Sequence, residues 1–180
     1  IAGSGNNINA DANYFFNTPT QQLEASINIK ELQTALLKSF IKSNVALGSG
    51  SMNGAIEVKG KIKQPEWKGL INFDSVLFTV NQFGPKYLVD QQKIKLDYPA
   101  IGFNGFTVKD SLGNPLIING NIFSKGKSRY DLDLKMTSHD FTLMNTSKAI
   151  NNQVYGHAGI ESKLSVTGTT FKPTIEGDIL

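Results

Sequence analysis

Residues 54–69 read G-A-I-E-V-K-G-K-I-K-Q-P-E-W-K-G, and a related sequence, V-T-G-T-T-F-K-P-T-I-E-G-D-I-L, begins at Val166. A constant offset of 108 residues brings identical residue types together at four positions, which are Val58 with Val166, Gly60 with Gly168, Pro65 with Pro173, and Gly69 with Gly177. Glycine and proline act on the backbone and not through packing. The spacing therefore predicts one strand–turn–strand repeat, used at residues 54–71 and again at 162–179.

The first copy of the repeat alternates between apolar or glycine positions and charged positions. A period of two places Ile56, Val58 and Ile62 on one face of a strand. The other face carries Glu57, Lys59, Lys61 and Lys63. A glycine such as Gly60 inside a strand usually marks a bulge or bend. The pattern predicts an amphipathic strand that curves towards its apolar side.

The composition excludes several classes of protein. The chain has 180 residues, 18 Lys and Arg against 15 Asp and Glu, and no cysteine. The net charge of +3 is spread over single outward positions, whereas nucleic-acid binding needs a clustered basic footprint, so we expect no nucleic acid among the partners. Without cysteine, disulfides and thiolate metal sites are excluded. Because Ile1 is neither an initiator nor part of a signal peptide, we expect a fragment of a longer protein.

The N-terminal part combines an irregular segment, a strand and a helix. Residues 1–12 are rich in Gly, Asn, Ala and Ser and predict a loop or flexible lead-in, with the domain at 13–180. Residues 23–29 alternate as a strand. The apolar positions then change period, which predicts one short amphipathic helix, with a capping box formed by Asn28 and Glu31; its apolar residues are Leu32, Leu36, Leu37, Phe40 and Ile41.

After Gly54 the sequence is dominated by strands of period two, separated by hairpin-length turns. Asp74 and Ser75 shift the phase of the alternation, as a bulge would. The pattern predicts about eight to ten amphipathic strands in an antiparallel sheet with one apolar face. A single helix covers little of such a face. Either the sheet closes into a sandwich, or it stays open as a trough that a ligand fills.

The residues that line the apolar face offer no site for a defined small molecule. The inward positions of the clear strands hold Ile, Leu, Val and Phe and no charged residue. A channel of this kind suits acyl chains, because burial of each methylene contributes about 0.8 kcal/mol and needs no directional contact. A pocket for a small molecule would show a few convergent polar groups.

No catalytic or metal-binding arrangement is predicted. His139 and His157 lie 18 residues apart and outside any metal-spaced cluster, so both are expected at the surface or in turns. Asp131 and Asp133 share a strand face with Lys135, which is typical of a solvated face. The sequence contains no nucleophile–base arrangement, and we expect a protein that is not an enzyme and has no cofactor. Trp67 is either a boundary aromatic or a packed residue at a strand end.

The order of these motifs resembles the C-terminal domain of the TamB family, the translocation and assembly module proteins of Gram-negative bacteria. The resemblance rests on G-x-I-x-V-x-G-x-x-x-x-P-x-W-x-G-x-I from Gly54 to Ile71. It continues through Y-L-V-D at 87–90, K-I-K-L at 93–96, V-K-D at 108–110 with G-N at 113–114, and Y-G at 155–156. It covers residues 22–180.

The resemblance implies a β-taco, or β-groove: an elongated, curved antiparallel sheet with a hydrophobic concave face, related to AsmA-like bridge proteins. Such proteins are anchored in the inner membrane, span the periplasm and are thought to carry phospholipids towards the outer membrane. TamB proteins also engage TamA, an outer-membrane barrel, in outer-membrane biogenesis and protein secretion. The implied partners are phospholipid acyl chains and a TamA-type barrel.

On this resemblance a set of apolar residues lines the groove. The set is Ile56, Val58, Ile62, Ile71, Phe73, Phe78, Ile94, Leu96, Ile118, Ile122, Leu132, Leu134, Leu164 and Val166. The leading hypothesis is a non-enzymatic lipid conduit. Two alternatives stay open, which are an interaction module that receives a strand from a barrel partner, and a closed β-sandwich of the adhesin type.

Overall fold

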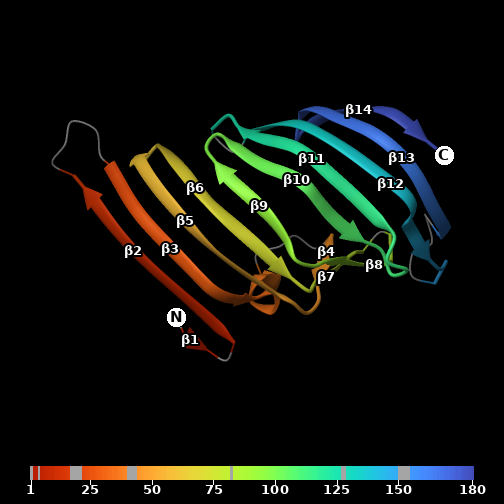
Figure 1. Cartoon of the computed structure of the whole chain (residues 1–180), viewed down its shortest axis with the longest axis horizontal. Helices are drawn as coiled ribbons and strands as arrows, with labels where there is room; N and C mark the ends of the chain where they lie inside the picture. Colours follow the sequence, from red (N-terminus) through yellow and green to blue (C-terminus); the bar gives the residue numbers. More distant parts are fainter. Residues whose placement is uncertain are drawn as a thin grey trace.

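The computed structural model describes residues 2–3, 5–16, 22–39, 44–81, 83–126, 129–149 and 155–180. These residues form one curved antiparallel sheet of 14 strands, in which the strands lie side by side from β1 to β14 (Figure 1). The strands are β1 (Ala2–Gly3), β2 (Asn6–Phe15), β3 (Gln22–Gln33), β4 (Val45–Leu47), β5 (Ser51–Lys61), β6 (Gln64–Asp74), β7 (Val76–Val80), β8 (Lys86–Val89), β9 (Gln92–Asp97), β10 (Ala100–Lys109), β11 (Pro115–Ser124), β12 (Tyr130–Thr146), β13 (Gly156–Thr169) and β14 (Lys172–Ile179).

The sheet is open. Its order is β1-β2-β3-β5-β6-β9-β10-β11-β12-β13-β14, and β4, β7 and β8 form a side branch off this path. The prediction of an all-β fold built on a curved antiparallel sheet is confirmed. The closed β-sandwich alternative is wrong for the described residues, because they form one sheet and not two facing sheets.

The predicted amphipathic helix is wrong. Leu32 lies in strand β3, and the helical part is a 3-10 helix of 6 residues, η1 (Thr34–Ser39). Asn28 and Glu31, the predicted capping box, also lie in β3, whereas Phe40 and Ile41 fall outside the described residues. A spacing of four fits both a helix and an alternating strand, so the pattern did not separate the two.

Part of the expected loop at residues 1–12 is also a strand. Residues 6–12 belong to β2, which pairs with β3 through Ile8 with Ile29 and Ala10 with Ile27. The alternation in β2 relies on alanine, whose small apolar side chain gives a weak periodic signal. Pairing with β3 therefore stabilises β2 as a strand, although the sequence of β2 itself has only a weak strand pattern.

One row of residues crosses the sheet from β2 to β14 and defines its apolar face. The row consists of Ala10, Ile27, Ile56, Gly69, Leu96, Ile101, Ile122, Leu132, Gly168 and Pro173. Each member is the registered partner of the next, so all of them lie on the same face. We call this face the inner face.

The two hairpins β5–β6 and β13–β14 have the same register. Gly60 pairs with Pro65 in the first, and Gly168 pairs with Pro173 in the second. Gly60 and Gly168 have φ values of 103° and 84°, which only glycine adopts readily. The residues aligned by the offset of 108 therefore occupy the same places in both hairpins.

Gly69 in the centre of β6 is required by the close approach of the neighbouring strand. A Cβ atom at Gly69 would collide with the carbonyl oxygen of Ala55 on β5. Gly177, its counterpart in the second hairpin, would collide in the same way with the carbonyl oxygen of Lys163. The absent side chains leave room on the inner face for the side chains opposite, Ile56 and Leu164.

The side branch begins at Ser75, where the chain leaves the main sheet. Ser75 has a φ of 52°, and its N–H and Oγ donate to Oδ1 of Asp90 at 2.9 and 3.0 Å. The phase shift predicted here as a bulge is thus a bend between β6 and β7. Strands β7 and β8 pair with each other, β4 pairs with β7, and β8 returns to the main sheet through the pair Leu88–Lys109. We call β4, β7 and β8 the ribbon.

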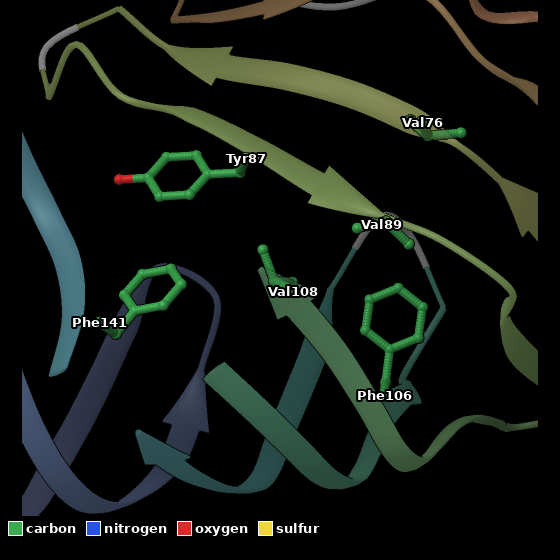
Figure 2. Packing of buried hydrophobic residues seen from close by; sticks show 6 residues of the cluster. All are labelled: Val76, Tyr87, Val89, Phe106, Val108 and Phe141. Carbon is green, nitrogen blue, oxygen red and sulfur yellow. The ribbon is translucent and has the colours of Figure 1, made fainter. Parts of the chain in front are cut away.

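The buried core lies between the ribbon and the main sheet. Val76, Tyr87 and Val89 of the ribbon face Phe106 and Val108 of β10 and Phe141 of β12 (Figure 2). These six are the buried hydrophobic residues of the described chain. The core therefore covers one end of the inner face only.

Asp110 fastens the β10–β11 turn to β12. Its Oδ1 accepts hydrogen bonds from the N–H groups of Leu112 and Asn114, and its Oδ2 accepts one from the N–H of Thr142 at 2.8 Å. Burial raises the pKa of this carboxyl, but the hydrogen bonds outweigh burial, and the pKa of Asp110 lies below its ordinary value.

A pair of glycine variants tests the close approach at Gly69. We expect Gly69→Ala to lower the free energy of unfolding by about 1–3 kcal/mol, because the backbone of β5 must shift. Gly159→Ala in β13 is the matched control, since nothing lies within 4 Å of its Cβ position and neither glycine has a left-handed φ. Urea unfolding measures the free energy of unfolding of both variants. Equal stability of the two variants would contradict the argument.

Asp110→Asn tests the carboxylate at the β10–β11 turn. We expect the free energy of unfolding to fall by about 2–3 kcal/mol near pH 7, because an amide cannot accept all three hydrogen bonds. Since the pKa of Asp110 is lower folded than unfolded, its contribution is complete above the unfolded pKa and is lost as pH falls through the folded pKa. The difference between the variant and wild type should shrink in urea unfolding from about pH 7 to about pH 3; a constant difference would argue against this role.

Candidate functional site: an apolar trough

The inner face carries apolar side chains from β3 to β13, and we call this apolar face the trough. Of the predicted lining residues, all except Ile62 and Phe78 take inner-face positions in the register. They are Ile56, Val58, Ile71, Phe73, Ile94, Leu96, Ile118, Ile122, Leu132, Leu134, Leu164 and Val166. Strand alternation brings them together, because the pairing keeps one register from β3 to β13 apart from local bulges.

The structure places the two other predicted residues elsewhere. Ile62 lies in the turn between β5 and β6 and is 46% exposed. Strand β5 ends one residue before it, at Lys61, so Ile62 no longer follows the alternation. Phe78 lies in β7, where its ring meets that of Tyr87 at 5.4 Å. Phe78 thus belongs to the ribbon and not to the trough wall.

Some inner-face residues were not predicted as lining. Ile101 and Phe103 of β10 lie in the middle of the trough, as the registered partners of Leu96 and Gly120 show. The register shifts between Phe103 and Phe106, which interrupts the alternation in the sequence. Phe106 forms edge-to-face contacts with both Phe103 and Phe73, each at 5.6 Å between ring centroids.

Most of the inner face has no protein layer over it. The lining residues named above are half-buried; Phe73, Ile94 and Ile118 pack against the buried core beneath the ribbon, and the others are not part of that packing. Half-burial of large aliphatic groups in the middle of a sheet is expected when neighbouring strands flank them and nothing covers them. The inner face is therefore a contiguous apolar surface that is open over much of its length.

The ribbon covers one end of the trough. The ring of Tyr87 stacks on Phe141 with centroids 5.5 Å apart and planes 10° apart (Figure 2). Its hydroxyl donates to the carbonyl oxygen of Leu143 at 2.7 Å, which ties β8 to β12. Burial raises the pKa of Tyr87, and the negative charge of Asp110 raises it further. The hydroxyl of Tyr87 therefore stays protonated.

Three polar side chains of the inner face have partners within the protein, whereas the buried Oγ1 of Thr146 has none among the described residues. Ser138 and Ser162 face each other at 2.8 Å between Oγ atoms, and Ser138 also contacts the carbonyl oxygen of Ile160. Gln92 donates to the carbonyl oxygen of Asp90 and accepts from the N–H of Thr107. Each of these three side chains therefore has at least one partner within the protein.

The side chains with reactive chemistry lie apart from the trough. His139 lies 3.5 Å from both Asp140 and Glu161, and all three side chains are more than half exposed. Asp131 pairs with Lys125 at 3.2 Å. The described residues contain no cluster of His, Cys, Asp or Glu that could hold a metal ion. No described helix is long and apolar enough to cross a bilayer.

Comparison with known proteins identifies the later part of the chain. The family model described as TamB C-terminal domain matches residues 104–180, which run from within β10 to the end of β14. No curated protein and no solved structure matches the chain. Residues 104–180 of the chain are therefore similar to the C-terminal domain of the TamB family.

Proposed function

We propose that the trough carries phospholipid acyl chains between the membranes of a Gram-negative bacterium, without catalysis. The observation that supports this function is the open inner face. Its row of apolar residues crosses the sheet from β2 to β14, and the ribbon covers one end only. Exposed apolar surface of this extent is typical of a site that receives an apolar partner.

The chemistry of the lining favours hydrocarbon over other ligands. Each buried methylene of an acyl chain contributes about 0.8 kcal/mol without a directional contact. Three hydrogen-bonding side chains of the inner face, Ser138, Ser162 and Gln92, already have partners within the protein. A ligand with many polar groups would leave them unpaired against Ile and Leu, at a cost in free energy.

The family gives the cellular setting. TamB proteins act in the envelope of Gram-negative bacteria, in outer-membrane assembly, and are not known as enzymes. We propose in addition that the protein lies in the periplasm and that its full-length form is anchored in the inner membrane. The proposed cargo is phospholipid.

A charge in the middle of the trough tests the lipid function. We expect Leu134→Arg to reduce the lipid bound to the purified chain by about tenfold or more, because an unpaired guanidinium is costly to place against hydrocarbon. Leu134 lies between Gly120 and Val166 on the inner face. Lipid extraction and native mass spectrometry measure the occupancy, and circular dichroism checks the fold.

Thr137→Arg is the matched control for this experiment. Thr137 lies on the same strand, faces outward, and gains the same charge. It should bind as much lipid as wild type. If folded Leu134→Arg binds lipid as well as Thr137→Arg does, the trough is not the lipid path.

A second function, strand addition by a TamA-type barrel partner, is favoured by the free edge of β14. All 8 residues of β14 are exposed. Glu161 and Leu180 exchange both backbone hydrogen bonds, so alternation turns the N–H groups of Ile175, Gly177 and Ile179 away from β13. Unpaired outward N–H groups are what an added strand needs.

Ile175→Pro tests strand addition. We expect it to weaken crosslinking of the chain to a TamA-type barrel by several-fold, because proline removes one outward donor and spares the bonds to β13. Ile175→Ala is the control, since it shortens the same side chain and keeps the N–H. Equal crosslinking by the two variants would count against pairing at this edge.

A further inference from the structure

The end of the sheet opposite the ribbon carries a basic notch between two long hairpins. The short β9–β10 turn ends at Tyr98, whose N–H donates to the carbonyl oxygen of Trp67. The hairpins on either side extend further than this turn. Strand β6 begins at Gln64, and the β11–β12 hairpin extends to Lys125, whose N–H donates to the carbonyl oxygen of Arg129. The recessed turn thus leaves a gap between the β5–β6 and β11–β12 hairpins.

Basic side chains line this gap. A hollow of about 580 Å³ lies there, and its walls are Lys61, Lys63, Gln64, Lys125, Gly126 and Arg129. Four of these six residues are basic and none is acidic. A second hollow of about 290 Å³ adjoins it and shares Lys125 and Arg129; it adds Asp131, Thr169 and the 81% exposed ring of Phe171. The notch is therefore the part of the rim where positive charge is concentrated.

The positive charge of the notch is only partly balanced. Lys125 forms an ion pair with Asp131 at 3.2 Å. Among the described residues, no ion pair involves Lys61, Lys63 or Arg129. Like charges that converge from two hairpins repel each other unless an anion lies between them. Lysine and arginine hold phosphate oxygens through charge-assisted hydrogen bonds.

The notch lies next to the apolar trough. Trp67 takes an inner-face position opposite Val58, and its ring meets that of Tyr98 edge to face at 5.6 Å. Leu96, a trough residue, is two positions before Tyr98, or about 7 Å along the strand. Amphipathic aromatic rings are suited to a boundary between an apolar and a wet region.

We propose that this notch binds the phosphate headgroup of an anionic phospholipid whose acyl chains lie in the trough. The inference rests on the lipid function proposed above and adds a headgroup site to it. Lys61, Lys125 and Arg129 take outward positions in the register, so the phosphate lies at the outer side of the rim. The acyl chains then cross the recessed β9–β10 turn to reach Trp67 and the inner face.

The test maps binding on the whole 180-residue chain by amide NMR with three soluble probes. These are dihexanoyl phosphatidylglycerol and dihexanoyl phosphatidylcholine, both below micelle-forming concentration, and inorganic phosphate. We expect phosphatidylglycerol to shift signals of the notch and of Trp67 and Leu96 together. Phosphatidylcholine, which carries no net charge, should shift the trough signals with at least several-fold lower affinity. Inorganic phosphate should shift the notch alone, and more weakly than phosphatidylglycerol.

A triple variant separates the notch from general electrostatics. Lys61→Gln/Lys63→Gln/Arg129→Gln should lower the affinity for phosphatidylglycerol about tenfold or more and leave that for phosphatidylcholine unchanged. Lys93→Gln/Lys135→Gln/Lys163→Gln removes the same charge from the outer face and should change neither. Equal losses in the two triple variants would overturn the headgroup site.

The outcomes also distinguish this site from the lipid function itself. If phosphatidylglycerol shifts only the trough signals, the headgroup site is wrong and the lipid function stands. If it shifts only the notch signals, as free phosphate does, the notch is a phosphate site unconnected to the trough and the inference is overturned. If neither lipid shifts trough signals, both proposals fail.

Discussion

Cross-strand pairing in nearly one register is the constraint on which this structure depends. A shift of one residue in any strand would send its apolar side chains to the opposite face. The ladder avoids this from β2 to β14, so that Ile27, Leu96 and Leu132 fall in the same transverse row. Where the register does shift, as between Ser138 and Phe141, apolar residues resume on the inner face. The result is an apolar surface wider than any single element of the chain can cover.

The two ends of the trough differ in chemistry. At one end the ribbon packs Tyr87 on Phe141, and Asp110 holds the adjacent turn with three backbone hydrogen bonds. At the other end, hairpins carry four basic side chains around a hollow, and among the described residues an ion pair involves only one of them, Lys125. The covered end resembles the core of an ordinary domain, whereas the rest of the inner face has the exposure of a surface. The two ends of the trough are therefore not equivalent. Its apolar wall lies between an end covered by the ribbon and a rim that carries positive charge.

Much of the fold followed from the sequence, and its errors have physical causes. Strict alternation around Ile56 and Leu132 predicted strands with one apolar face. The helix was wrong because Leu32 continues strand β3 and only the short 3-10 helix Thr34–Ser39 follows, in which Leu36 is 49% exposed and forms no buried apolar stripe with Leu32. Strand β2 was missed because its inward positions include Ala10 and Ala12, which have little hydrophobic signal of their own and depend on the partner strand β3.

The sequence by itself determined the all-β class, the apolar face and most of the residues on it, because side-chain direction along a strand depends only on local alternation. Only the tertiary structure decided that the sheet stays open, that β4, β7 and β8 cover one end, and that Lys61 and Arg129 meet across a recessed turn. These features depend on strand order and on the relative lengths of hairpins far apart in the chain. Local periodicity carries no information about either.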